Sequence, residues 1–552
     1  MEKLQQLDYI AFLIYMLLMA GIGVFFGWFI KDIKDYFKGG NTIPWIIGGI
    51  SNYMGLFSSF VFVAHAGIAY QYGLIGVLIL WSTVFPCIIA SKFLAARWRR
   101  SGIITPVEYL ETRFNSNVRQ TFSWIGLGMR FLDNLVRLYA IGIFISTATH
   151  FSFMESVLIS GFVITMFTII GGVWAVVVMD AIQFVILIFA SLIMVPLSLD
   201  AVGGLGNLME KQPEHFGFMN GPNGNFFWIL VYFLLISLKY NGNWAFIQRF
   251  YSVKDEPSSK KLGYFTAILF FVFPIFFLLP AIAATEIFPV LANPEMAYVA
   301  TAVKLLPSGI MGLMLAAIFS ATMSSLNSEF NIMSGVLTND IYKRLWNATG
   351  TDKHYLWVAR INIILVGLVA TVGALYVGQL GGAFEANKLL TGLFAIPLAI
   401  PLVFGILFKK PNSIGALATV IVGILAGLLL NSHPEISWEL ATFIEILICF
   451  AIFFSSGWWV PKTIEYKDRV EQFFKLINTP LRPDEIPNIS PKFKKMLSNV
   501  FVIALALSGL LIITMVLFSL GTKGSNIAII GALFYFLFAF VVFLVGKRTS
   551  QH

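Results

Sequence analysis

The chain has 552 residues, of which 58% are hydrophobic and 12% are charged, and its mean hydropathy is +0.83. A soluble protein cannot cover that much apolar surface, whereas a protein with many membrane spans needs it. The formal net charge of +9 does not indicate nucleic-acid binding, because the basic residues lie in short loops, where they orient a membrane protein. The two cysteines, Cys87 and Cys449, lie in apolar runs, which argues against a disulfide framework and excludes a zinc site made by them alone.

A membrane-spanning helix needs about 20 apolar residues, and about fifteen stretches of the chain meet this criterion. The first is expected to be a retained helix rather than a signal peptide, because it has no basic segment before it and no convincing cleavage site. In chain order, the expected spans lie near residues 9–30, 44–70, 74–94, 121–147, 156–174, 177–199, 226–247, 264–287, 309–337, 356–377, 384–408, 414–430, 438–460, 497–520 and 527–545.

The loops between these spans alternate in charge. Basic loops follow the first, third, seventh and ninth spans, whereas loops such as 203–225 and 431–439 are poor in Lys and Arg. Because basic loops stay in the cytoplasm, this pattern predicts an N-terminus outside and a cytoplasmic C-terminus. The stretch 462–495 is polar and interrupted by prolines, so we expect a cytoplasmic connector there rather than a soluble domain.

Two spans are interrupted by polar and flexible residues at comparable depth. The second contains 51–55 (SNYMG) with Ser58 and Ser59, and the seventh contains 239–243 (KYNGN). Either break alone fits a harmless kink, since Gly and Ser are common in membrane helices. Paired breaks five helices apart are typical of transporters built from inverted repeats, whose unwound backbone holds a cation and a solute near the midplane. The pair therefore favours a functional interpretation.

The ninth span carries a polar stripe in the run 321–328 (ATMSSLNS). Ala321, Ser324, Ser325 and Ser328 have the spacing i, i+3, i+4 and i+7, which places three hydroxyls on one helix face. Oxygen ligands suit a small hard cation, and a neutral stripe can bind and release a monovalent ion. Taken alone, the stripe is better explained by hydroxyls that bond to their own helix or to a neighbour. The two helix breaks shift the interpretation toward a cation site.

Charged residues inside the spans need partners. Asp180 lies in the sixth span, where a carboxylate toward the helix centre costs about 2.5–3.5 kcal/mol, and either a bound cation or a role as a helix cap would compensate. Lys239 lies in the second break, where a solute carboxylate, Asp133 or a carbonyl would serve as partner. One face of the fourth span either contacts a solute or forms a salt-bridge seam. That face carries Arg130, Asp133, Asn134 and Arg137.

Several short motifs resemble the sodium/solute symporter family, which includes sodium–glucose, proline and sialic acid cotransporters. The resemblance covers residues 9–462 and rests on 35–40 (DYFKGG), 43–45 (IPW), 171–176 (GGVWAV), 180–183 (DAIQ), 247–249 (IQR), 324–328 (SSLNS) and 340–343 (DIYK). It implies an all-α integral membrane protein with a LeuT-type core of two inverted five-helix repeats. The expected parts are an N-terminal extra helix and loop at 1–42, the first repeat at 43–200, the second repeat at 201–410, and C-terminal helices at 411–552.

The resemblance also implies where sodium binds. A first ion is expected between the second and ninth spans, held by the carbonyls of Met54, Phe57 and Ala321 and the hydroxyls of Ser324 and Ser325. Some family members bind a second sodium ion nearer the cytoplasm. The matching residues in this chain are Asp180, Ser324, Asn327 and Ser328, where Asn327 replaces a more usual Ser but can still ligate through its amide oxygen.

The expected solute contacts depart from those of sugar-transporting relatives. Val61 stands where those proteins place Gln, and Ile236 and Lys239 stand where they place Asn and Tyr. Lys239 points to an anionic or carboxylate-bearing solute, although sugar, sugar acid and organic acid all stay open at this stage. The residues expected to contact the solute are Ser58, Val61, Asp133, Lys239 and Asn243.

The sequence therefore predicts a secondary active transporter of the inner or plasma membrane, not an enzyme, that couples one or two sodium ions to a small polar organic solute by alternating access. Its expected partners are the solute and the lipid bilayer, with no nucleic acid and no obligate protein partner. The alternative is a membrane sensor on a transporter-like scaffold, although no appended soluble output domain is evident. A membrane-embedded enzyme is disfavoured because His65 and His150 have no evident spacing partners.

Overall fold

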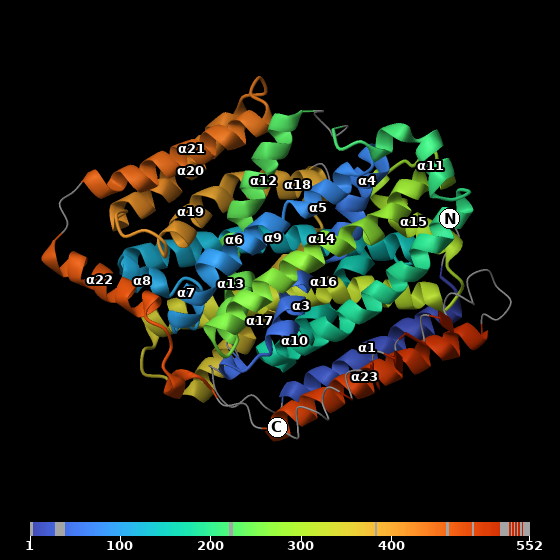
Figure 1. Ribbon diagram of the computed structural model, residues 1–552, viewed down its shortest axis with the longest axis horizontal. Helices are drawn as coiled ribbons and strands as arrows, with labels where there is room; N and C mark the ends of the chain where they lie inside the picture. The colour runs from blue at the N-terminus through green and yellow to red at the C-terminus, as the bar shows by residue number, and fades with distance from the viewer. Residues whose placement is uncertain are drawn as a thin grey trace.

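The protein is a bundle of helices in the computed structural model, which describes residues 4–27, 39–219, 225–380, 383–459, 463–487 and 491–518, with scattered positions beyond 518. The helices α20 (Ser413–Ser432) and α21 (Trp438–Ser455) pack on one side of the bundle, and α1 (Gln6–Gly27) and α23 (Pro491–Phe518) on the opposite side (Figure 1). No β-strand occurs among the described residues, where the only ladder contact is the isolated bridge between Ile43 and Val253.

Most expected spans are helices close to their predicted positions. The fourth, eighth, ninth and tenth are α9 (Ser116–Ala148), α14 (Glu256–Ile287), α16 (Ile310–Gly335) and α17 (Asp352–Ala374). The third consists of α5 (Ile75–Trp81), α6 (Val84–Ile89), a π-helical turn and α7 (Ala95–Arg100). The eleventh consists of α18 (Ala383–Leu390), a second π-helical turn and α19 (Ile396–Phe404).

The number of spans differs from the predicted count of about fifteen. Among the described residues, ten helices are long and apolar enough to cross a membrane, and three shorter apolar helices accompany them. The difference arises partly because the broken spans are divided into shorter helices. About half of the expected span 527–545 lies outside the described residues, as do the first three residues and much of the DYFKGG motif.

The fifth and sixth expected spans lie within one helix, α10 (Phe153–Ala201). A straight helix of 49 residues would be about 73 Å long, far more than a bilayer. Thr168 contacts Asn327 and Asp180 accepts from Ser324, so residues twelve positions apart on α10 meet residues one turn apart on α16. Because twelve residues of straight helix rise about 18 Å, α10 bends sharply between them. The bend allows one continuous helix to supply two spans.

Both predicted breaks are present. The second span divides into α3 (Trp45–Met54) and a helix that resumes before the π-helical turn Val61–His65 and α4 (Ala66–Tyr72). The seventh divides into α12 (Phe226–Asn241) and α13 (Trp244–Ser252). Gly242 ends α12 where a Cβ would come within 2.8 Å of the Ala399 Cβ, so the missing side chain permits close packing on α19. The Asn243 side chain caps α13 by accepting from the Ala245 and Phe246 amides.

The helix that carries the polar stripe, α16, is the centre of the bundle, and every one of its residues is buried. Its N-terminus is held by Asp8 of α1, whose carboxylate accepts the Gly309 and Gly312 amides at 2.6 and 2.9 Å. A carboxylate at this position stabilises the positive end of the helix dipole. The N-terminal extra helix therefore fixes the outer end of α16 against the rest of the bundle.

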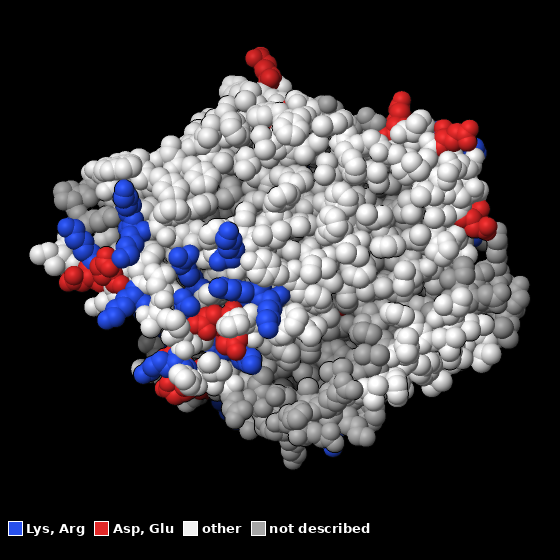
Figure 2. All heavy atoms as spheres, viewed as in Figure 1, with Lys and Arg blue, Asp and Glu red and all other residues white. Residues whose placement is uncertain are grey.

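Charge separates the two ends of the molecule. Figure 2 shows Lys and Arg gathered at the end formed by α7, α8 (Tyr109–Arg113) and α22 (Ile464–Asn478), whereas the far end displays mainly Asp and Glu. The connector expected at 462–495 contains α22, whose Phe473 stacks on Tyr109 with ring centroids 5.7 Å apart. One basic end is the arrangement that the loop pattern predicts. The orientation of the chain in the membrane stays a prediction.

Candidate functional site

The two helix breaks converge on the continuous helices α9 and α16. In the first break, the Ser59 amide donates to Thr322 Oγ1 on α16 at 2.7 Å, and Arg137 of α9 donates to the Gly55 carbonyl at 3.1 Å. In the second break, Arg130 of α9 donates to the Gly242 carbonyl at 3.2 Å. Unwound backbone is stable at membrane depth only when protein groups or a cavity satisfy it, and these contacts do so.

The residues expected to hold the first sodium ion are all buried. Met54, Phe57, Ala321 and Ser325 have no exposed surface, and Ser324 is 1% exposed. The hydrogen bond between Ser59 and Thr322 holds the first break against the stripe, so Ser325 faces the bundle interior rather than lipid. The Ser325 hydroxyl donates to the Thr322 carbonyl of its own helix at 2.9 Å. Hydrogen bonding within one helix is the alternative to ion binding that the sequence also allowed. The five-oxygen cage itself stays a prediction.

The residues expected to hold a second sodium ion already have partners within the protein. The Asp180 carboxylate accepts hydrogen bonds from Ser51 and Ser324. Arg249 lies 3.9 Å from Asp180 and donates to the Ser328 hydroxyl at 2.7 Å. These contacts belong to a residue inside α10, so the hypothesis that Asp180 caps a helix is wrong; the N-cap of α10 is Ser152.

Arg249 is a partner of Asp180 that sequence reasoning missed, because the IQR triplet served only as a mark of the family. A carboxylate buried at membrane depth needs a cation beside it, so Asp180 itself indicated that a cation is present. The sequence alone does not show that this cation is Arg249. Asn327, the third side chain expected at the second ion, contacts Thr168 Oγ1 at 2.5 Å. An ion bound there would compete with these internal contacts.

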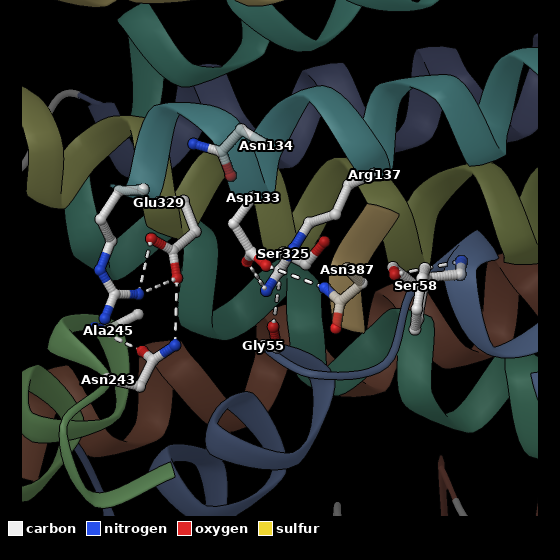
Figure 3. Close-up of polar contacts among 12 residues, drawn as sticks. Gly55, Ser58, Asp133, Asn134, Arg137, Asn243, Ala245, Ser325, Glu329 and Asn387 are labelled. Atoms are coloured by element: carbon white, nitrogen blue, oxygen red, sulfur yellow. Dashed lines mark hydrogen bonds and ion pairs between the residues drawn. The ribbon is translucent and has the colours of Figure 1, made fainter. Parts of the chain in front are cut away.

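A second carboxylate, Asp133, lies between two cations. Its Oδ2 accepts from Arg137 at 3.1 Å, and its Oδ1 lies 3.4 Å from Lys239 Nζ and accepts from the Asn387 amide at 3.0 Å. Figure 3 shows the Arg137 guanidinium between Asp133 and the Gly55 carbonyl, with the Asn387 amide also directed at Asp133. Lys239 also donates to Thr391 Oγ1 at 2.8 Å. The fourth expected span, α9, thus connects both helix breaks with the eleventh expected span. Asn387 and Thr391 of the eleventh span were not expected from the sequence.

A third charged pair lies where α9, α16 and the second break meet. Arg130 binds Glu329 at 3.0 Å, and the Asn243 amide donates to the same carboxylate at 3.4 Å (Figure 3). The Arg130 guanidinium also lies over the Trp244 ring, 5.3 Å from its centroid. Glu329 is therefore engaged in an ion pair.

All five residues expected to contact the solute line one cavity. Those residues are Ser58, Val61, Asp133, Lys239 and Asn243. Arg137, His65 and Asn387 also line it, together with apolar and aromatic side chains from the first break and from α12 and α14. The cavity also reaches Phe57, whose carbonyl is one of the expected sodium ligands. Solute and ion would therefore bind next to one another.

Other metal chemistry finds no support in the part of the chain that the structure describes. No group of three or more His, Cys, Asp or Glu side chains there could hold a metal ion. The oxygen atoms that surround the stripe come from hydroxyl, amide, carboxylate and main-chain groups, which suit alkali cations better than transition metals.

The chain resembles known sodium-coupled transporters. The model of the sodium:solute symporter family matches residues 36–423. A sodium/glucose cotransporter of Vibrio parahaemolyticus is 27% identical over 473 residues, covering 78% of this chain and 86% of that protein. The human sodium-coupled monocarboxylate transporter 2 is 26% identical (76% and 71% covered), and a sodium/sialic acid symporter of Aliivibrio fischeri is 25% identical (78% and 89% covered).

Among solved structures, a sodium-coupled sialic acid symporter in a substrate-bound outward-open state superposes with a TM-score of 0.75 at 22% sequence identity. The match covers 83% of this chain and 99% of that one. A match at this identity establishes the fold, and it confirms the LeuT-type helical architecture expected from the sequence.

Proposed function

Because the chain belongs to the sodium:solute symporter family, we propose that it is a sodium-coupled symporter that carries a small polar organic solute across the inner or plasma membrane by alternating access. The observation that carries this proposal is the contact between the first helix break and the hydroxyl stripe, the Ser59–Thr322 hydrogen bond, beside a cavity that the predicted solute residues line. A multi-pass membrane protein with this arrangement has the parts that coupling requires.

Sodium would bind between the break and the stripe. The carbonyls of Met54, Phe57 and Ala321 and the hydroxyls of Ser324 and Ser325 would replace its hydration shell, and Ser325 would turn from the Thr322 carbonyl toward the ion. Binding there links α16 to the broken span and favours the state in which the solute cavity is complete. Solute affinity then rises with sodium, and sodium affinity rises with solute, by the same factor.

We infer one sodium ion per cycle. At the second set of residues, Asp180 and Ser328 are bound by the Arg249 guanidinium, which supplies the positive charge that a second ion would bring. A sodium ion at Asp180, Asn327 and Ser328 would have to displace Arg249 from Ser328 and Thr168 from Asn327. These internal partners support a site filled by the protein itself, and two ions per cycle is the alternative.

The chain divides into the expected parts under this proposal: an extra helix and loop at 1–42, two inverted repeats at 43–200 and 201–410, and C-terminal helices from 411. Each repeat then begins with one of the two broken spans, which places both breaks at the midplane. The N-terminus would lie outside and the C-terminus in the cytoplasm, so that the basic end faces the cytoplasm.

The test is uptake of a labelled solute panel into proteoliposomes with an inward sodium gradient, with equal sodium on both sides, and with potassium in place of sodium. A symporter accumulates at least one solute only under the inward sodium gradient. A sensor on the same scaffold would bind a solute without accumulating it, and uptake that is indifferent to sodium would contradict coupling.

A further inference from the structure

Charge is balanced in two of the three buried clusters around the helix breaks and unbalanced in the third. Arg130 is matched by Glu329, and Arg249 is matched by Asp180. The third cluster has one carboxylate, Asp133, between two cations, Arg137 and Lys239. With His65 neutral, the described charged residues that line the cavity, Asp133, Arg137 and Lys239, therefore carry one net positive charge.

Asp133 is largely engaged within the protein, because its two oxygens already accept three donors and a carboxylate has about four acceptor sites. Arg137 occupies Oδ2, while Lys239 and Asn387 share Oδ1. A carboxylate so surrounded orients its neighbours. Asp133 is therefore a positioning residue that holds Arg137 and Lys239 at the cavity wall.

The unpaired charge is exposed to the cavity rather than sealed in protein. Both Arg137 and Lys239 line the cavity, whereas Glu329, Asp180 and Arg249 do not. The guanidinium of Arg137 has five N–H donors, two of which bind the Gly55 carbonyl and Asp133. An unmatched cation at membrane depth is unfavourable, and an anion in the cavity would remove that cost.

Three of the neutral polar side chains that line the cavity already have partners within the protein, while Ser58, Thr83 and Tyr232 also present hydroxyls to it. Ser82 donates to the Ile79 carbonyl, Asn243 caps α13, and Asn387 binds Asp133. Most of the remaining wall is apolar or aromatic, including Val61, Leu80, Ile236, Phe246 and Phe270. Such a wall fits the body of a small organic acid better than a ring of sugar hydroxyls.

From these observations, which rest on the proposed symport function, we propose that the transported solute is a compact organic monocarboxylate whose carboxylate binds Arg137 and Lys239 in this cavity. One negative charge balances the cluster, whereas a phosphate dianion would overshoot it by one. The planar carboxylate also matches the guanidinium fork of Arg137, which favours paired hydrogen bonds.

The experiment uses the full-length protein in proteoliposomes with an inward sodium gradient and matched solute pairs. The pairs are lactate with lactamide, pyruvate with acetone, and gluconate with glucose, with inorganic phosphate as a further anion. We expect uptake of one or more short monocarboxylates and no uptake of their neutral partners. Sodium-driven uptake of a neutral partner, or of phosphate but no carboxylate, would overturn the proposal, as would the absence of sodium-driven carboxylate uptake.

Variants connect the result to the cluster. Lys239→Gln should raise the half-saturating carboxylate concentration by roughly 30- to 5,000-fold, the usual consequence of removing one member of a buried charge pair. Lys239→Arg should recover part of that loss. The control is Lys211→Gln, the same change at a side chain that is 54% exposed and outside the cavity, which should leave uptake unaltered.

Asp133→Asn separates a binding role from a structural one. Removing this carboxylate raises the net charge of the cavity from one to two, so preference should shift from a monocarboxylate toward a dicarboxylate such as succinate. A merely structural role would lower uptake of both equally, and that outcome counts against the charge argument.

A further measurement distinguishes failure of the carboxylate assignment from failure of the proposed symport. It is the thermal stabilisation of the wild-type protein by sodium, measured without solute. If sodium does not stabilise the protein, sodium coupling is contradicted. If sodium stabilises the protein and a neutral solute is taken up, only the carboxylate assignment is contradicted.

Discussion

The two buried carboxylates Asp180 and Asp133 belong to similar clusters of charged side chains that differ in accessibility. Each lies on a long helix beside a helix break, and each has an arginine partner. The pair of Asp180 and Arg249 is sealed, with 0% and 2% of the two side chains exposed. Asp133 and Lys239 are 11% and 14% exposed and border a cavity. Their difference in accessibility and in charge balance, rather than the presence of an ion pair, distinguishes a structural cluster from a solute site.

The largest effect is expected from breaking the sealed pair. Arg249→Gln leaves Asp180 buried without its cation, which should lower the free energy of unfolding by about 3–5 kcal/mol. Chemical unfolding of the purified variant in detergent measures this loss. Addition of Asp180→Asn should restore most of the stability, because the unpaired charge is then gone. If Arg249→Gln is as stable as the wild type, the pair is not what holds this cluster together.

The variant Arg249→Gln also tests whether the Arg249 guanidinium takes the place of a second sodium ion. Once Arg249 is gone, Asp180 and Ser328 are free to bind a second sodium ion, so sodium should stabilise Arg249→Gln more than it stabilises the wild type. The difference in unfolding temperature between sodium and potassium buffers measures this effect. An equal sodium response in both proteins would contradict the idea that Arg249 takes the place of an ion.

A smaller effect is expected where the first break is tied to the stripe. Thr322→Val keeps the side-chain shape but removes the acceptor of the Ser59 amide, and an unsatisfied buried amide costs about 1–3 kcal/mol. Stability should fall by that amount, and the half-saturating sodium concentration for uptake should rise. If stability falls but the half-saturating sodium concentration is unchanged, the Ser59–Thr322 hydrogen bond does not contribute to sodium binding.

A still smaller effect is expected for a charge pair at the surface. Lys409 and Glu471 lie 2.7 Å apart, but their side chains are 48% and 65% exposed. Exposed pairs contribute about 0.2–1 kcal/mol at most, since water screens them. Glu471→Gln should therefore change neither uptake nor unfolding beyond that range. A loss comparable to that of Arg249→Gln would show that burial is not what separates these pairs.

No effect is expected from membrane potential on carboxylate uptake. One sodium ion and one monocarboxylate carry no net charge, so an imposed potential of about 100 mV should leave the accumulation ratio unchanged. If a second ion bound at Asp180, one net charge would move, and about 2.3 kcal/mol would raise the ratio roughly 50-fold. A potassium gradient with valinomycin sets the potential for this measurement.

Local features of the site were predictable from the sequence, and partnerships across the fold were not. Gly, Asn and Ser in apolar runs identified both helix breaks, because these residues weaken helices wherever they occur. The five residues expected to contact the solute all line one cavity, and their role in solute binding stays a prediction. Arg249, Asn387 and Thr391 were missed because helical periodicity shows which residues share a face but not which faces meet. The two spans expected at 156–174 and 177–199 are both present, but the sequence did not show that one helix, α10, continues through both.

The most direct test of the account is equilibrium binding of radioactive sodium to the purified protein without any solute. We predict one sodium ion per chain in the wild type, a marked loss of binding in Ser325→Ala, and unchanged binding in Ser334→Ala. Ser334 lies on the same helix but donates to the Ala359 carbonyl, so it controls for the loss of a buried hydroxyl. Binding that is equal in all three proteins would contradict a sodium site between the first break and the stripe.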